Sequence, residues 1–61
     1  MKLVIEIKMD NEAFEENRGA EAARILRELA QGLEDDFLEP GVSQKLFDVN
    51  GNHVGISQVR K

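Results

Sequence analysis

The tripeptide Asn50-Gly51-Asn52 strongly constrains the fold of the C-terminal third of this chain. It separates two segments rich in β-branched and apolar residues, 45–49 and 53–59. An Asn-Gly step between such segments is one of the strongest short-range hairpin signals, because both residues tolerate the positive φ angles of a tight turn. We therefore expect two antiparallel strands joined by that turn.

The length of the turn decides which side chains of the hairpin face the core. With a two-residue loop, four apolar side chains share the core face: Phe47, Val49, Val54 and Ile56. A three-residue loop instead groups Leu46 with Val54 and Ile56. Val59 fits neither arrangement without a β-bulge, for which Gly55 is suited. We favour the two-residue loop.

The first nine residues alternate between two faces, which is typical of a half-buried strand. The face expected to point inward carries Leu3, Ile5, Ile7 and Met9. The other face carries Lys2, Val4, Glu6 and Lys8. Residues 10–17 predict a turn from which Phe14 packs back onto the core.

A single amphipathic helix follows. At about 100° per residue, its apolar side chains fall within roughly 160° of arc. They are Ala22, Ala23, Ile25, Leu26, Leu29, Ala30 and Leu33. We expect the helix to begin near residues 18–20 and to end near 32–34 at Gly32, with an end near Asp36 as the alternative. Glu21 with Arg24, and Arg24 with Glu28, are expected to pair on its exposed face.

These elements predict one α+β domain over residues 1–61, in the order β-α-β-β. The sheet is three-stranded and mainly antiparallel, in the strand order 1-3-2, with the helix packed on one face. In the connection 34–43, Pro40-Gly41 predicts a tight turn, and Phe37 or Leu38 covers the end of the core. The opposite face stays open and displays Lys2, Val4, Glu6 and Lys8 together with some of Leu46, Asp48, Ser57 and Val59.

A chain of 61 residues without cysteine has limited means of stabilising itself. It buries only about 60% of the surface that its unfolded form exposes, and no disulfide compensates for this. Homodimerisation or docking onto a larger protein would add burial. The longest apolar run is residues 3–5, so we expect no membrane span and a cytoplasmic location.

Charge is segregated along the chain. Residues 10–39 hold ten acidic residues and three arginines, a net charge of −7, and the remaining residues have a net charge of +3. An acidic surface of this kind either meets a basic partner, such as a protein that normally binds nucleic acid, or is a solvated face.

The residues that could carry catalysis do not form a recognisable site. Ser57 and His53 lie four residues apart on one expected strand, about 13 Å along it and beyond hydrogen-bond reach. The segment 48–52 resembles the start of a calcium loop, but His53 and Val59 occupy positions that need glycine and glutamate. We expect a non-enzymatic protein with no cofactor and no metal.

Three stretches, MKLVIEIKMDNEAFEENRG, AARILRELAQGLE and KLFDVNGNHVG, together cover most of the chain. They resemble short uncharacterised proteins of tailed bacteriophages and prophages, a group with no assigned activity. The resemblance implies a small accessory protein made in a bacterial host cell, and it assigns no functional residue.

The leading hypothesis is therefore protein–protein binding through the first strand, at Lys2, Val4, Glu6 and Lys8. A second hypothesis is an acidic decoy that occupies a basic groove of a nucleic-acid-binding host protein, using Glu34, Asp35, Asp36 and Glu39. A third is weak nucleic-acid binding through the open sheet face, which an acidic chain without exposed aromatic residues disfavours. The expected state is a monomer or a weak homodimer, with an unknown protein partner.

Overall fold

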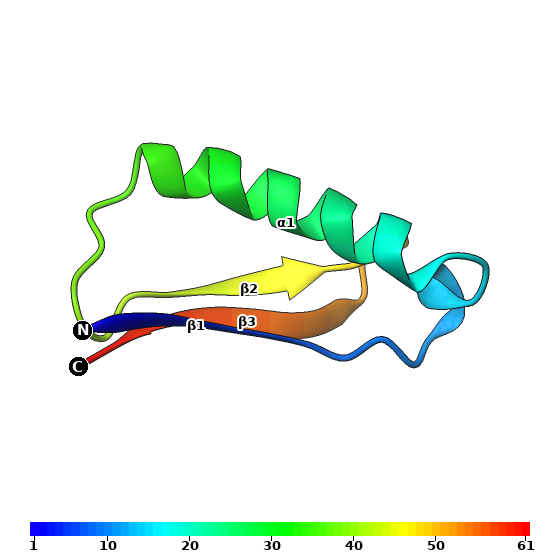
Figure 1. The fold of residues 1–61 in the computed structure, drawn as a ribbon, viewed down its shortest axis with the longest axis horizontal. Coiled ribbons are helices and arrows are strands. Elements are labelled where there is room, and N and C mark those ends of the chain that lie inside the picture. The colour runs from blue at the N-terminus through cyan, green and yellow to red at the C-terminus, as the bar shows by residue number, and fades with distance from the viewer.

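The computed structural model describes residues 1–61 as one helix lying along one face of a small sheet (Figure 1). The elements are β1 (Lys2–Ile7), the 3-10 helix η1 (Glu12–Phe14), α1 (Arg18–Glu34), β2 (Ser43–Phe47) and β3 (His53–Arg60). The sheet order is β1-β3-β2 and both strand pairs are antiparallel. The predicted fold class, strand order and position of the helix are confirmed.

The helix α1 is capped by Asn17 at its N-terminal end and by Asp35 at its C-terminal end. The Asn17 side chain accepts a hydrogen bond from the Ala20 N–H at 2.9 Å, which satisfies one of the free amides of the first turn. Residues 32–34 remain helical, so the predicted glycine stop at Gly32 is wrong. The last helical residue is Glu34, so the predicted end within residues 32–34 is confirmed and the alternative end near Asp36 is not.

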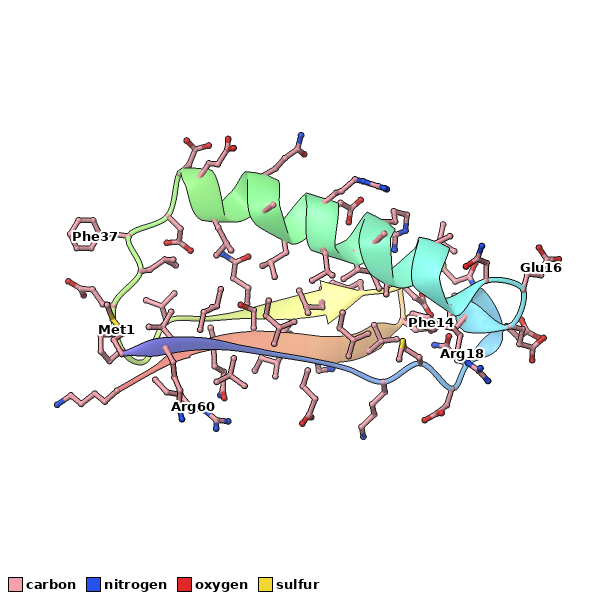
Figure 2. The ribbon with its side chains drawn as sticks, in the orientation of Figure 1. Met1, Phe14, Glu16, Arg18, Phe37 and Arg60 are labelled. Carbon is pink, nitrogen blue, oxygen red and sulfur yellow. The ribbon has the colours of Figure 1, made fainter.

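The fully buried core side chains come from η1, α1, β2 and β3, and the half-buried Ile7 of β1 packs against them. Its most buried apolar residues are Phe14, Ile25, Leu29, Leu46, Val54 and Val59. Phe14 is 1% exposed and enters from η1, which the Asn11 side chain caps by accepting from the Ala13 N–H. Figure 2 shows Phe14 close to the start of α1, so the expectation that this side chain packs back onto the core is confirmed.

The connection between α1 and β2 contains the predicted tight turn. The Val42 N–H donates to the Glu39 carbonyl at 3.0 Å across Pro40-Gly41. Leu38 is half-buried, whereas Phe37 is 79% exposed. Phe37 therefore does not cover the end of the core.

The turn of the hairpin has three residues, Val49 to Gly51, and not two. The Asp48 N–H donates to the Asn52 carbonyl at 2.9 Å, and the Gly51 N–H donates to the Asp48 carbonyl at 3.0 Å. Gly51 has a φ of 84°, as the last residue of a three-residue hairpin loop requires. The preferred two-residue loop is therefore wrong.

A β-bulge in β3 then changes the faces of the hairpin again. Leu46 pairs with Gly55 but Phe47 pairs with His53, so Val54 is the extra residue. The bulge lets Val54 and Val59 both point into the core, beside Leu46. The predicted β-bulge near Gly55, which Val59 needed in order to face the core, is therefore confirmed.

The predicted side-chain faces of the hairpin need correction as a result. Phe47 and Val49 are exposed, and Ile56 pairs with Glu6 and Lys45 on the open face. Four residues expected to be candidates for the open face are buried instead: Leu46, Asp48, Ser57 and Val59. The longer loop and the bulge cancel in register, so residues 43–46 pair with 55–58 as a two-residue Asn50-Gly51 loop would also pair them. The difference is that the sheet turns its other face toward α1.

Candidate binding surface on the first strand

β1 lies at one edge of the sheet, so one side of its backbone has no partner strand. The Lys8 N–H donates to the Val54 carbonyl at 2.8 Å, which continues the pairing with β3 one residue past the strand. Because backbone groups alternate in direction along a strand, those of Val4 and Glu6 also face β3. The N–H and C=O groups of Leu3 and Ile5 point away from the sheet.

The side chains proposed from the sequence as contacts on β1 lie on the open face. Lys2, Glu6 and Lys8 are exposed, and Val4 is half-buried. Lys2 stands directly opposite Arg60 of β3. Like charges in directly opposite positions destabilise a strand pair.

The other side of β1 faces α1 but is incompletely covered. Leu3 and Ile5 share this side with the buried Val59 and Ser57 of β3. They nevertheless remain 41% and 39% exposed, because α1 packs mainly against β2 and η1. Figure 1 shows α1 along one face of the sheet, above β2 in this view.

A leucine of α1 is exposed toward the same side. Arg24 marks the flank of the helix that lies over β2, because its guanidinium donates to the Phe47 carbonyl at 3.2 Å. Leu26 lies two residues further on, about 200° around the helix, and is also exposed. We refer to Leu3, Ile5 and Leu26 as the uncovered apolar strip.

The four acidic residues proposed as a second site are all exposed at the C-terminal end of α1: Glu34, Asp35, Asp36 and Glu39. Asp36 is partly engaged, since it accepts hydrogen bonds from the Phe37 N–H and the Gln44 side chain, both at 2.8 Å. Figure 2 places Phe37 of this connection at the same end of the molecule as Met1. The acidic group therefore lies near the start of β1 and far from Lys8.

Glu21 is a buried residue that sequence reasoning missed. Its carboxylate binds Arg24 through two contacts, of 2.8 and 3.1 Å, and accepts the Val49 N–H at 2.8 Å. The hydrogen bond from Arg24 lowers the pKa of Glu21, although burial opposes the shift, and the same contact raises the pKa of Arg24. This network fixes the first half of α1 to the hairpin turn. Both predicted ion pairs of Arg24 form, with Glu21 and with Glu28, but the Glu21 carboxylate is buried and only Glu28 lies on the exposed face.

Asp48 organises the hairpin turn from inside. Its carboxylate accepts four hydrogen bonds, from the backbone of Asn50 and Asn52 and from the side chains of Asn11 and Asn52. Burial alone would raise the pKa of Asp48, but these hydrogen bonds together lower it. The pattern Asp48-x-Asn50-x-Asn52 is the sequence signal for this arrangement, since short polar side chains of this kind bond nearby backbone amides in turns.

The open face carries an aromatic pair that the sequence did not predict. The rings of Phe47 and His53 lie 5.8 Å apart at an angle of 50°. Lys45 pairs with Ile56 on the same face, two residues from Phe47. An exposed aromatic residue therefore stands close to a lysine at the β2 edge.

Among the surface hollows, only the one of about 250 Å³ on the open face holds both a carboxylate and a histidine, Glu6 and His53. The widest hollow, of about 340 Å³, lies between residues 40–42 and 58–61 and offers Arg60 and Lys61 but no carboxylate or histidine. No three histidine, aspartate or glutamate side chains group closely enough to hold a metal ion. No helix has the length and hydrophobicity to span a membrane.

Comparison with known proteins adds no assignment to this geometry. No protein-family model, curated protein or solved structure matches the chain.

Proposed function

We propose that this chain is a small, non-enzymatic accessory protein of the bacteriophage or prophage type that acts in the bacterial cytoplasm by binding another protein. The binding surface is β1: its free backbone edge, the uncovered apolar strip, and the open-face side chains Lys2, Val4, Glu6 and Lys8. Proteins commonly recognise such edges by adding a strand, in which backbone hydrogen bonds provide affinity and alternate side chains provide specificity.

The observation that carries this proposal is the incomplete cover of β1. Leu3 and Ile5 lie in the middle of the strand, on the side that faces the helix, and a large part of each side chain is in contact with solvent. Each buried CH₂ group stabilises a complex by about 0.8 kcal/mol, so a partner that covered these side chains would gain substantially. Their backbone groups are also the ones that lack a partner strand.

A valine-to-glutamate pair of variants tests the proposal. Val4→Glu places a charge in the centre of β1, and we expect it to abolish retention of a discrete host protein from bacterial lysate. Val49→Glu is the matched control, because Val49 is 64% exposed in the hairpin turn. Both variants should keep the helical circular dichroism signal. Equal retention by Val4→Glu and the wild type would refute the proposal.

The acidic decoy is the second candidate, and the position of its carboxylates favours it. Glu34, Asp35 and Asp36 follow one another at the C-terminal end of α1, where the helix dipole is unfavourable for negative charge. Residues that oppose local stability in this way are often retained for an interaction. Neutralising Glu34, Asp35 and Glu39 should weaken binding to a basic partner, and the wild-type complex should dissociate as salt is raised. A salt-insensitive complex would exclude this candidate.

Weak nucleic-acid binding through the open face gains support from the exposed Phe47–His53 pair. Exposed aromatic rings beside lysines are the usual platform for stacking single-stranded bases. The prediction is a gel shift of a single-stranded oligonucleotide at low salt that Phe47→Ala abolishes. Absence of a shift for the wild type removes this candidate.

A further inference from the structure

The free edge of β1 restricts how another strand could pair with it. Only the backbone groups of the odd-numbered residues, such as Leu3 and Ile5, point outward. A second copy of β1 that pairs antiparallel must therefore place odd residues opposite odd residues. The twofold axis of such a pair then passes through one residue of the strand. When the axis moves to the next residue, the partner opposite each side chain changes by two residues.

Charge distinguishes these registers. Centred on Val4, the pairing sets Lys2 of each copy opposite Glu6 of the other, with Leu3 opposite Ile5 on the helix side. Centred on Ile5, it sets Lys2 opposite Lys8. Centred on Glu6, it sets two carboxylates opposite each other. Like charges directly opposite are destabilising in a sheet, so both of these latter registers are disfavoured.

The register centred on Ile7 also pairs opposite charges, Glu6 with Lys8. It depends on pairing beyond Ile7, where β1 ends and the chain turns toward η1. The Val4 register keeps all its paired residues within the first seven positions of the chain. It is therefore the one register with complementary charge over the length of the strand.

We propose, building on the role assigned to β1 above, that the partner bound by this edge is a second copy of the chain. The two β1 strands pair antiparallel about Val4 and join the two sheets into one of six strands. Four backbone hydrogen bonds form, between Leu3 and Ile5 of the two copies in both directions. The open face of the joined sheet remains accessible.

Two features of the single chain are improved by this pairing. Lys2 stands opposite Arg60, and the incoming Glu6 places a carboxylate next to that like-charged pair. Leu3 and Ile5, exposed in the single chain, pack against their counterparts on the helix side. A 61-residue chain with a small core gains stability from such additional burial.

The other edge of the sheet is less suited to the same role. The Phe47 carbonyl on β2 already accepts a hydrogen bond from Arg24. Lys45 is exposed in the middle of β2 and would meet Lys45 of a second copy in a pairing centred there. A lysine at such a position discourages edge-to-edge pairing.

Charge exchange on β1, followed by analytical ultracentrifugation of the full chain, tests the register. Lys2→Glu should weaken dimerisation by about tenfold, because two opposite-charge pairs become two like-charge pairs. The double variant Lys2→Glu/Glu6→Lys should restore the wild-type dissociation constant. Arg27→Glu is the matched control: it also reverses an exposed positive charge, but on α1 and away from the sheet edge, and should have little effect.

The outcomes that would overturn the proposal are distinct. A wild type that stays monomeric at millimolar concentration excludes the dimer, and dimers unaffected by Lys2→Glu exclude pairing through β1. The Val4 register is also excluded if the double variant Glu6→Lys/Lys8→Glu has the wild-type dissociation constant and Lys2→Glu/Glu6→Lys does not. If the chain stays monomeric while Val4→Glu still abolishes retention of a host protein, only this inference fails and the proposed function survives.

Amide hydrogen exchange provides an independent measurement. The amides of Val4 and Glu6 face β3 and should be protected at every concentration. Those of Leu3 and Ile5 should exchange rapidly in dilute samples and become protected as the dimer forms. Rapid exchange of Leu3 and Ile5 in a sample shown to be dimeric would contradict strand pairing at this edge.

Discussion

Three single residues have a large structural role: Gly55, Glu21 and Asp48. Gly55 lies opposite Ile7, and a Cβ at this position would overlap the Glu6 carbonyl oxygen. Glu21 and Asp48 are buried carboxylates whose hydrogen bonds join segments distant in the sequence. Single-atom changes at these positions therefore have consequences for the whole domain.

Gly55→Ala should destabilise the chain by about 1–3 kcal/mol, because β1 must move away from β3 to accept the methyl group. Urea denaturation measures the effect. Gly19→Ala is the control, since the nearest atom to an added Cβ there is the Asn17 side-chain oxygen at 3.6 Å, an ordinary contact. That variant should be as stable as the wild type or slightly more so, given the helix propensity of alanine. Equal stability of the two variants would show that β1 adapts freely.

Acidification should destabilise the fold through Glu21 and Asp48. Both carboxylates have a pKa below the ordinary values of 4.5 and 3.8, so the unfolded chain takes up protons before the folded chain does. Their contribution is complete above about pH 5 and is lost as the pH falls through the lowered pKa values. Denaturation curves between pH 7 and pH 3 test this. Glu21→Gln and Asp48→Asn should be less stable at pH 7 and lose less on acidification, whereas a pH-independent wild type would contradict the assignment.

At the scale of elements, the sequence was sufficient to predict the three strands, the α-helix and their order, but not the 3-10 helix η1, whose residues were expected to form a turn. Strict alternation over residues 1–9 and apolar spacing over residues 22–33 are local properties, so β1 and α1 could be recognised without knowledge of the fold. The same holds for the turn at Pro40-Gly41 and for the hairpin. The side chains predicted to lie on the exposed face of β1 also follow from this alternation alone.

The buried face of the hairpin could not be predicted, because tertiary packing decides which face of the sheet α1 covers. The turn uses three residues, and β3 then takes up Val54 as a bulge. Glu21 was missed for a related reason: it lies four residues before Ile25, on the buried side of α1, where an apolar residue is expected. Its burial becomes favourable only when Arg24 and the Val49 amide are both in place.

The end of α1 offers a prediction at this scale. Asp35→Lys should stabilise the chain by about 0.3–1 kcal/mol, because it replaces a negative charge at the C-terminal end of the helix by a positive one. Thermal denaturation at low salt is the appropriate measurement. Glu39→Lys makes the same change of charge beyond the helix and should have a smaller effect. If Asp35→Lys were destabilising, the carboxylate at position 35 would have a favourable contact within the chain.

The molecule as a whole depends on one small core. Six apolar residues are buried, and they come from η1, α1, β2 and β3. A domain of this length has a free energy of unfolding of only about 3–9 kcal/mol. Loss of one large core side chain is therefore comparable to the total stability.

Phe14→Ala should remove about 3–5 kcal/mol and leave the chain largely unfolded at 37 °C. Phe37→Ala, at an exposed phenylalanine, should change stability by less than about 0.5 kcal/mol. Circular dichroism and the dispersion of amide proton signals distinguish the two outcomes. A folded Phe14→Ala variant would mean that η1 contributes little to the core.

The bulge in β3 determines where this chain tolerates changes in length. A regular β2–β3 ladder would offer the core only a glycine at the position next to Leu46, and the extra residue fills that space with the side chain of Val54. Deletion of this one residue would leave the other β2–β3 pairings in place and yet remove an isopropyl group from the middle of the core. Insertions and deletions are consequently expected to be accepted between residues 35 and 42, on the surface, and to be rejected within the hairpin.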